Sequence, residues 1–174
     1  MFQVNDIVLY NQTDVYRVQG IQSMPFLDQG RMDYYVLKPI YEDSPSNSTV
    51  YVPVDADSSR LHKAFSAAEL QALLDEGGRK IAWIDAPTIR KKEYNALLNH
   101  GQPQDLIGLI RMLCNRREEK ARRGLHMGEA DEKLLLNAEK RLYPLFRYTL
   151  NVNWNDFLKL VTGERTLDLA AVAP

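Results

Sequence analysis

The sequence predicts an α+β fold, with a small N-terminal β-barrel followed by an all-helical C-terminal domain. Short β-prone runs separated by turn residues occupy the first 60 residues. Beyond residue 57 the apolar residues recur at helical spacing, and capping residues and glycines mark the segment ends. A hydrophobic content of 45% in 174 residues is enough for one or two small cores. We therefore expect a barrel domain at residues 1–60, a helical domain at 66–163 and a loose tail at 164–174.

The clearest strand signal is a hairpin over residues 34–55. Two β-prone runs, YYVLKPIY and TVYVPVD, flank a loop rich in Asp, Ser, Pro and Asn. Alternate residues of the second run point to opposite faces of the sheet, so its valines form a core face. The outward face carries Thr49, Tyr51 and Pro53. Because proline cannot donate a ladder hydrogen bond, Pro53 predicts that this strand lies at a sheet edge or ends there.

Four or five short antiparallel strands fit into the first 60 residues, which is typical of a small Tudor-like or SH3-like barrel. Strands are expected at residues 6–10, 15–24, 32–41 and 49–54, and protruding loops at 25–30 and 42–48. Gly20, inside the second strand, predicts a β-bulge or a sharp bend. Met24, Pro25 and Phe26 form an apolar cluster that is either a partner contact or a plug of the barrel.

Capping residues divide the rest of the chain into helices. The motif Ser66-x-x-Glu69 is a capping box, and Gly77-Gly78 ends the first helix. An extended connector is expected over residues 79–87. Four more helices are expected: one capped by Thr88 and ended by Gly101, one from Pro103 to Arg123, one from Glu129 to Thr149, and one from Asn153 to Gly163. Pro144 is expected to kink the third of these or end it near Tyr143.

The charge distribution separates the middle of the chain from its flanks. The whole chain has a net charge of −1, but residues 79–123 hold 11 Lys/Arg and 5 Asp/Glu, a net of +6. Residues 1–65 hold 5 Lys/Arg and 8 Asp/Glu, a net of −3. The basic middle is either a solvated helical face or a surface for nucleic acid.

Recognisable catalytic chemistry is absent from the sequence. It contains no GxGxxG, P-loop, HExxH or GxSxG motif, and its three histidines are scattered without a partner at ligand spacing. The single cysteine, Cys114, lies in an apolar helical stripe and is expected to fill the core. We therefore expect a binding protein with no catalytic residues, no metal, no cofactor and no small-molecule substrate.

No membrane partner is expected either. The N-terminus lacks a basic segment followed by an apolar core, and no apolar run approaches the roughly 20 residues that span a bilayer. We expect a cytoplasmic, nucleoid-associated protein.

The hairpin also carries a resemblance to a known family. YYVLKP followed by TVxVPVD resembles the RNA-polymerase-interacting domain shared by CarD/CdnL regulators and the bacterial transcription-repair coupling factor. Downstream, LIxLIRMLxxRREEK and DEKLLxxAEKRLYPL resemble the helical part of CarD-like proteins, so the similarity runs from Phe2 to about Leu150. No helicase motor is present, and the chain is therefore expected to be a stand-alone CarD-like regulator.

The resemblance implies that the barrel edge docks on the lobe of the RNA polymerase β subunit by sheet extension. The residues expected to bind polymerase are Tyr51, Thr49, Pro53 and Met24. Tyr51 and Met24 stand at positions where other members often present basic residues. An exposed tyrosine beside an unpaired strand edge is a feature that protein-binding surfaces use.

The resemblance further implies that the helical domain contacts promoter DNA and modulates the stability of the open complex. The residues expected to contact DNA are Trp83, Arg90, Lys91, Lys92, Arg116 and Arg117. CarD-like proteins insert a tryptophan from the start of a basic helix, but the corresponding position falls nearer Pro87 than Trp83. Trp83 is thus either an apolar wedge for the minor groove or an anchor to the helical core. Part of the basic charge is expected to be paired internally, through Glu118 with Arg122 and Glu119 with Arg123.

Two other functions stay open. The barrel is alternatively a protein-interaction module without a direct DNA role, and a small enzyme is the third and least favoured possibility.

Overall fold

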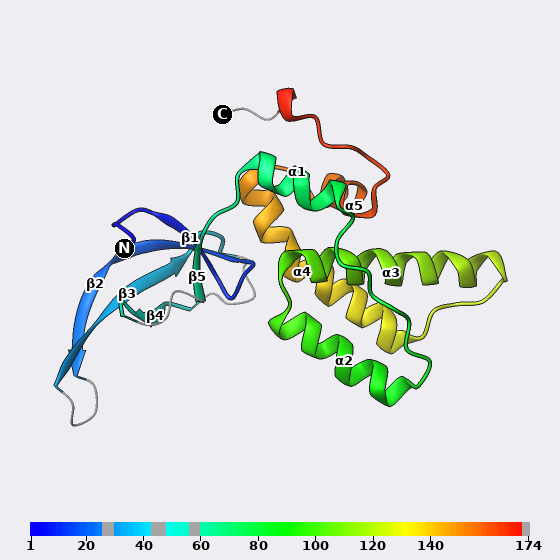
Figure 1. Cartoon of the computed structure of the whole chain (residues 1–174), viewed down its shortest axis with the longest axis horizontal. Coiled ribbons are helices and arrows are strands. Elements are labelled where there is room, and N and C mark those ends of the chain that lie inside the picture. The colour runs from blue at the N-terminus through cyan, green and yellow to red at the C-terminus, as the bar shows by residue number, and fades with distance from the viewer. Residues whose placement is uncertain (26–29, 43–47, 56–59, 172–174) are drawn as a thin grey trace. The chain divides into compact units, whose positions relative to one another are not determined.

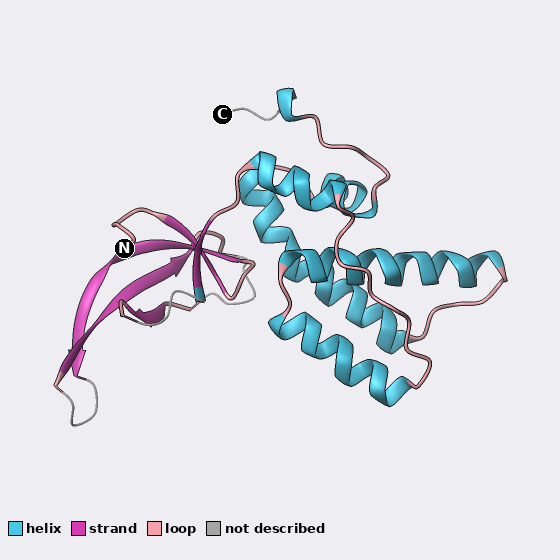
Figure 2. Ribbon diagram, in the orientation of Figure 1, coloured by secondary structure: helices cyan, strands magenta, loops and turns pink. Residues whose placement is uncertain are grey.

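A computed structural model describes residues 1–25, 30–42, 48–55 and 60–171. The chain divides into two compact units, Met1–Ala64 and Phe65–Pro174. The first holds all the strands and the second holds the α-helices (Figure 1, Figure 2). No described helix is both long enough and apolar enough to cross a membrane.

The N-terminal unit is a five-stranded antiparallel sheet with strand order β4-β3-β2-β1-β5. Its strands are β1 (Ile7–Tyr10), β2 (Asp14–Pro25), β3 (Arg31–Pro39), β4 (Val50–Pro53) and β5 (Leu61–Lys63). The predicted α+β class is confirmed. Strand β5 was not located by the sequence analysis, because three residues are too few to show an alternating pattern, and it lies beyond the expected end of the barrel at residue 60.

The bulge predicted at Gly20 is confirmed. Val18 pairs with Leu37 and Gly20 pairs with Val36, so Gln19 is the extra residue on β2. Val18, before the bulge, shares the core face with Leu37. Gly20, after the bulge, shares the outer face with Val36.

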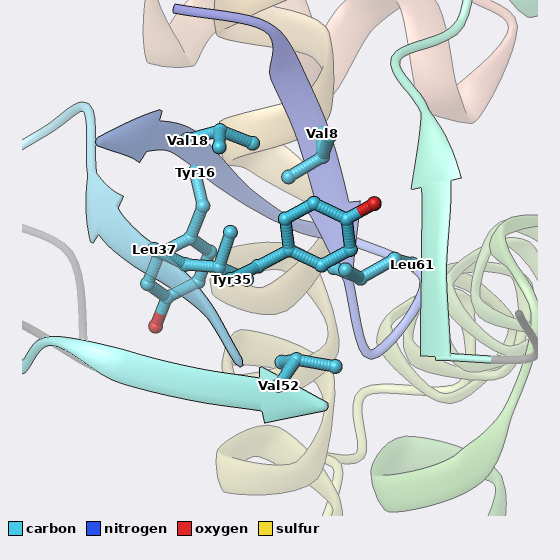
Figure 3. Packing of buried hydrophobic residues seen from close by; sticks show 7 residues of the cluster. All are labelled: Val8, Tyr16, Val18, Tyr35, Leu37, Val52 and Leu61. Carbon is cyan, nitrogen blue, oxygen red and sulfur yellow. The ribbon is translucent and has the colours of Figure 1, made fainter. Parts of the chain in front are cut away.

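All five strands contribute side chains to one apolar core (Figure 3). The cluster consists of Val8, Tyr16, Val18, Tyr35, Leu37, Val52 and Leu61. Phe2 covers it from the N-terminal segment: its ring meets the Tyr35 ring edge-on at 5.9 Å between centroids, and its N–H donates to the Tyr35 hydroxyl at 3.0 Å. Val50 and Val54 are partly buried against the same cluster, which confirms the predicted core face of the valines.

The C-terminal unit packs its helices around two central ones, α3 and α4, each of which contacts the other four (Figure 1). The helices are α1 (Ala67–Asp75), α2 (Pro87–His100), α3 (Pro103–Arg122), α4 (Glu129–Leu150) and α5 (Trp154–Thr162). The predicted capping box is present, since Ser66 and Glu69 bond reciprocally at the start of α1. Asn153 caps α5, and Gly163 ends it in a left-handed conformation.

One expectation about a helix end was wrong. Thr88 does not cap α2: the helix begins one residue earlier, at Pro87, with Ala86 at the N-cap and no side-chain bond. Proline suits this first position because its missing N–H has no partner there anyway. The helix predicted over Glu129–Thr149 is confirmed: Pro144 lies inside α4, which continues to Leu150, so of the two expected effects of this proline, the end near Tyr143 does not occur. The side chains around it, Leu142, Leu145 and Phe146, are fully buried, and their packing outweighs the cost of about 3 kcal/mol for an internal proline. After α5, the tail carries a short 3-10 helix at Leu169–Ala171.

Candidate functional site

The first candidate site is the β4 edge of the sheet. β4 pairs with β3 and is the terminal strand of the described sheet, which confirms the edge position predicted from Pro53. The Val54 N–H donates to the Asp33 carbonyl at 2.8 Å, so the backbone groups of Val54 point toward β3. Backbone groups alternate in direction along a strand, and those of Tyr51 and Pro53 therefore point away from β3. At this position the absent N–H of Pro53 costs the sheet no hydrogen bond.

The side chains on β4 alternate as predicted. Val52 is 5% exposed in the core, whereas Tyr51 is 46% exposed on the outer face. Thr49, directly before β4, is also exposed, and Pro53 is half-buried. Tyr51 and Pro53 thus direct both their backbone groups and their side chains outward. A strand added at this edge would contact both.

The outer face continues as an apolar surface across β3. Val36 stands beside Tyr51 in the register, Tyr34 stands beside Pro53, and Met32 lies two residues before Tyr34 on β3. Met24 pairs with Met32, so the register places it on this outer face and not in the barrel core as a plug. Phe26, the third member of the apolar cluster, lies outside the described residues. The structure therefore brings the four predicted polymerase-binding residues onto one face of the sheet.

The second candidate site surrounds Trp83 in the connector between α1 and α2. Its indole is half-buried and is absent from the apolar core of the helices, so it is not a fully buried anchor. The indole N–H donates to the Asp85 carboxylate at 3.1 Å. The guanidinium carbons of Arg90 and Arg116 lie 4.3 and 4.8 Å from the ring centroid, which is the geometry of cation–π contacts.

The backbone on both sides of Trp83 is held from α2. The buried Tyr94 hydroxyl donates to the Ala82 carbonyl at 2.7 Å and accepts from the Ile84 N–H at 3.0 Å. Burial raises the pKa of the Tyr94 hydroxyl, which keeps it protonated and able to donate at neutral pH. The Arg90 guanidinium adds a bond to the Ile84 carbonyl at 2.7 Å. Trp83 is therefore presented by a fixed segment of backbone.

Close contact between two glycines joins the start of the connector to α3. A Cβ atom on Gly108 would lie 1.8 Å from the Arg79 carbonyl oxygen, and one on Gly78 would lie 2.5 Å from the Gly108 nitrogen. Gly78 also has a φ of +75°, which a side chain would strain. The Arg79 N–H donates to the Gln104 carbonyl at 2.8 Å. Only glycine at both positions permits this approach of the connector to the helix.

A basic groove of about 670 Å³ runs between the connector and α3, with Trp83 at its wall. Arg79, Lys80, Arg111 and Arg116 line it, together with Glu76 and Glu119. The sequence analysis did not single out Arg79, Lys80 or Arg111, although the Arg-Lys pair after Gly77-Gly78 was an available signal. Arg111 also has a structural role, since it donates to the carbonyls of Val161 at 2.7 Å and Leu74 at 3.2 Å.

The structure does not bring all the predicted DNA-contacting residues together. Trp83 and Arg116 line the basic groove, and both Arg90 and Arg116 contact the Trp83 ring. Arg90 and Lys91 line a separate groove of about 580 Å³ between α2 and α4. Arg117 lies toward α4, where it approaches the Glu132 carboxylate at 3.7 Å. The predicted DNA-contacting residues therefore do not gather at one groove.

Most of the predicted cations are already paired with carboxylates. Arg90 makes a two-pronged ion pair with Asp131 at 3.0 and 3.1 Å, and both side chains are nearly buried. Arg116 pairs with Glu119 at 2.8 Å. The predicted Glu118–Arg122 pair is present at 3.9 Å, but the Glu119–Arg123 prediction was wrong because Glu119 turns to Arg116. Arg90 is consequently a structural residue rather than an available phosphate contact.

Several lysines keep their charge available. Lys80, Lys91 and Lys92 are exposed, and no ion pair to any of them occurs in the part of the chain that the structure describes. These three lysines are therefore available to bind an external phosphate.

Cys114 is a core residue, as predicted. It is 5% exposed, and burial raises the pKa of its thiol to about 11, so it stays protonated at neutral pH. Over the described ranges, no group of three or more His, Cys, Asp or Glu side chains is arranged to hold a metal ion.

Comparison with known protein families shows a similarity over the N-terminal unit. The family model described as CarD-like/TRCF RID domain matches residues 2–64, the stretch that contains all five strands and the β4 edge. No curated protein matches the chain.

Proposed function

We propose, from the premise that residues 2–64 belong to the CarD-like/TRCF RID domain family, that this protein regulates transcription by binding the RNA polymerase β subunit and promoter DNA together. Family membership makes the N-terminal unit a Tudor-like RNA-polymerase-interacting domain that acts in transcription. The β subunit as the partner, the DNA contact and the effect on the open complex are our proposals. The role requires binding alone and no catalysed reaction.

The observation that carries the proposal is the β4 edge within the matched domain. Tyr51 and Pro53 direct backbone groups away from β3, and Tyr51 adds an aromatic side chain that is 46% exposed. A polymerase segment in extended conformation would pair with this edge and extend the sheet. Main-chain hydrogen bonds would supply affinity, and the outward side chains would supply specificity.

In the helical unit, the groove beside Trp83 and the exposed lysines support a weak contact to DNA. Lys80, Lys91 and Lys92 would bind backbone phosphates, and Trp83 would contact the minor groove after moving away from Arg116. With so few available cations, DNA affinity alone should be low and salt-dependent, and the polymerase contact would raise the effective concentration. Stabilisation of the open complex by about 1.4 kcal/mol would raise its equilibrium ratio tenfold.

Polymerase binding is tested with Tyr51→Glu in the full chain. We expect the substitution to weaken binding to purified RNA polymerase by at least about tenfold, because an exposed anchor becomes a carboxylate that the interface must desolvate. Leu136→Glu is the matched control, since Leu136 is 42% exposed on α4 in the other unit. Full binding by Tyr51→Glu would count against the edge as the docking site.

DNA contact is tested with the double variant Lys91→Ala, Lys92→Ala and with Lys80→Ala. Each lost phosphate contact should reduce the slope of log affinity against log salt by about 0.9 and shorten the lifetime of the promoter complex. Lys140→Ala, an exposed change on α4, is the control. If lifetimes and salt slopes stay unchanged in both variants, the DNA role fails.

A second candidate function is a polymerase-binding module with no direct DNA role. The observation that favours it is the internal pairing of Arg90, Arg116 and Arg117 with carboxylates. Under this alternative, the Tyr51 variant loses polymerase binding while the lysine variants leave the promoter complex unaffected.

A further inference from the structure

We infer that the polymerase segment that pairs with β4 presents an apolar or aromatic side chain, not an acidic one, beside Tyr51. The inference rests on the proposed function and specifies the chemistry of the partner at the same edge. It follows from the register of the outer face and from the positions of the charges on it.

The backbone of β4 restricts which partner position meets Tyr51. Tyr51 directs both its N–H and its C=O outward, whereas Pro53 offers only a carbonyl. A partner strand therefore obtains a complete hydrogen-bonded pair at Tyr51 and an incomplete one at Pro53. The partner residue opposite Tyr51 stands one strand spacing away, about 4.8 Å, on the same outer face.

Among the described residues, the two cross-strand rows at and next to that position carry no charged side chain. The cross-strand row through Tyr51 contains Val36 and Gly20, and a Cβ on Gly20 would meet nothing within 4 Å. The next row, toward Pro53, contains Tyr34 and Gln22. Tyr34, Val36 and Pro53 are half-buried and Tyr51 is 46% exposed, so the surface is apolar and accessible.

The nearest cations on this face belong to the row on the other side of Tyr51. Arg17 pairs with Lys38 in the register, and continuation of the β3–β4 register places Thr49 beside Lys38. A carboxylate beside Tyr51 would therefore be desolvated against aromatic and aliphatic carbon with no cation in its own row. An apolar or aromatic side chain gains by burial at the same position.

The test compares two opposite charges at one position. The affinity of Tyr51→Lys and Tyr51→Glu for purified RNA polymerase is measured in the full chain. Tyr51→Phe retains the ring without the hydroxyl. Lys38→Gln is the control for the neighbouring charged row. Because Tyr51 is exposed, the variants should fold, which circular dichroism and thermal unfolding check.

We expect Lys and Glu at position 51 to weaken binding by at least about tenfold and to similar extents, since an apolar partner rejects either sign. The Tyr51→Phe and Lys38→Gln variants should bind within about threefold of the unmodified chain. Binding by Tyr51→Lys that equals or exceeds that of the unmodified chain would show an acidic partner residue and overturn the inference. A loss by Tyr51→Phe as large as that by Tyr51→Glu would also overturn it, because the hydroxyl would then be the essential group. If the unmodified chain itself does not bind polymerase, the proposed function fails, which is a distinguishable result.

Discussion

Replacing Gly108 by alanine tests whether the contact between the connector and α3 holds the connector in place. The added Cβ would lie 1.8 Å from the Arg79 carbonyl oxygen and 2.9 Å from its carbon, where ordinary contact begins near 3.4 Å. The two backbones must separate by roughly 1.6 Å, because neither contacted atom can rotate away as a side-chain end would. That displacement breaks the 2.8 Å hydrogen bond from the Arg79 N–H to the Gln104 carbonyl.

The expected magnitude is the balance of three effects. Overpacking costs about 1–3 kcal/mol, the lost hydrogen bond costs about 1 kcal/mol, and the better helix propensity of alanine returns about 1 kcal/mol. Gly108→Ala should therefore lower the free energy of unfolding by about 1–3 kcal/mol, or the melting temperature by several degrees.

Thermal and urea unfolding followed by circular dichroism measure this loss. Asn115→Ala, at an exposed position on the same helix, is the control that changes helix propensity without the steric contact. A Gly108→Ala protein as stable as the Asn115→Ala control would refute the close approach of the connector to α3.

Two further predictions concern buried polar groups. Tyr94→Phe removes the hydroxyl that bonds Ala82 and Ile84 while keeping the ring. Urea unfolding should show that the free energy of unfolding falls by about 1–3 kcal/mol. Unchanged stability would mean that the hydroxyl does not fix the connector. Burial raises the pKa of Glu139 above its unfolded value, so its favourable contribution is complete below about pH 4.3 and is lost as the pH rises through the folded pKa. Glu139→Gln should therefore be more stable than the unmodified chain at pH 7, with the advantage shrinking as the pH falls toward 4; a constant difference across that range would contradict the assignment.

The fold was largely predictable because its signals are local. The alternation of Val50, Tyr51 and Val52, the position of Pro53 and the bulge at Gly20 depend on strand geometry alone, and the structure has each as predicted. The capping box at Ser66 is equally local, because its hydrogen bonds join residues three apart. The sequence predicted the helix over Glu129–Thr149 but left open whether Pro144 would kink it or end it, because the packing that outweighs the proline depends on contacts with other helices.

The candidate sites likewise contain features that local sequence predicts and features that depend on contacts between distant residues. Which side chains of β4 face outward follows from sequence periodicity, so the outward-facing residues of the β4 edge were found without the structure. Which cations remain available does not follow from it, because Arg90 is 41 residues from the Asp131 that pairs with it. Arg79, Lys80 and Arg111 join Trp83 at one groove only through the Gly78–Gly108 approach.

The sequence by itself thus determined the α+β class, the edge strand and the exposure of Tyr51, because these depend on periods of two and 3.6 residues and on the backbone limits of proline and glycine. Tertiary structure alone decided that Trp83, in the connector, lies against two arginines, and that three of the five cations predicted to contact DNA are paired with carboxylates. Ion pairs and cation–π contacts join side chains that are distant in the chain, and their energies depend on distances that only the packed helices set.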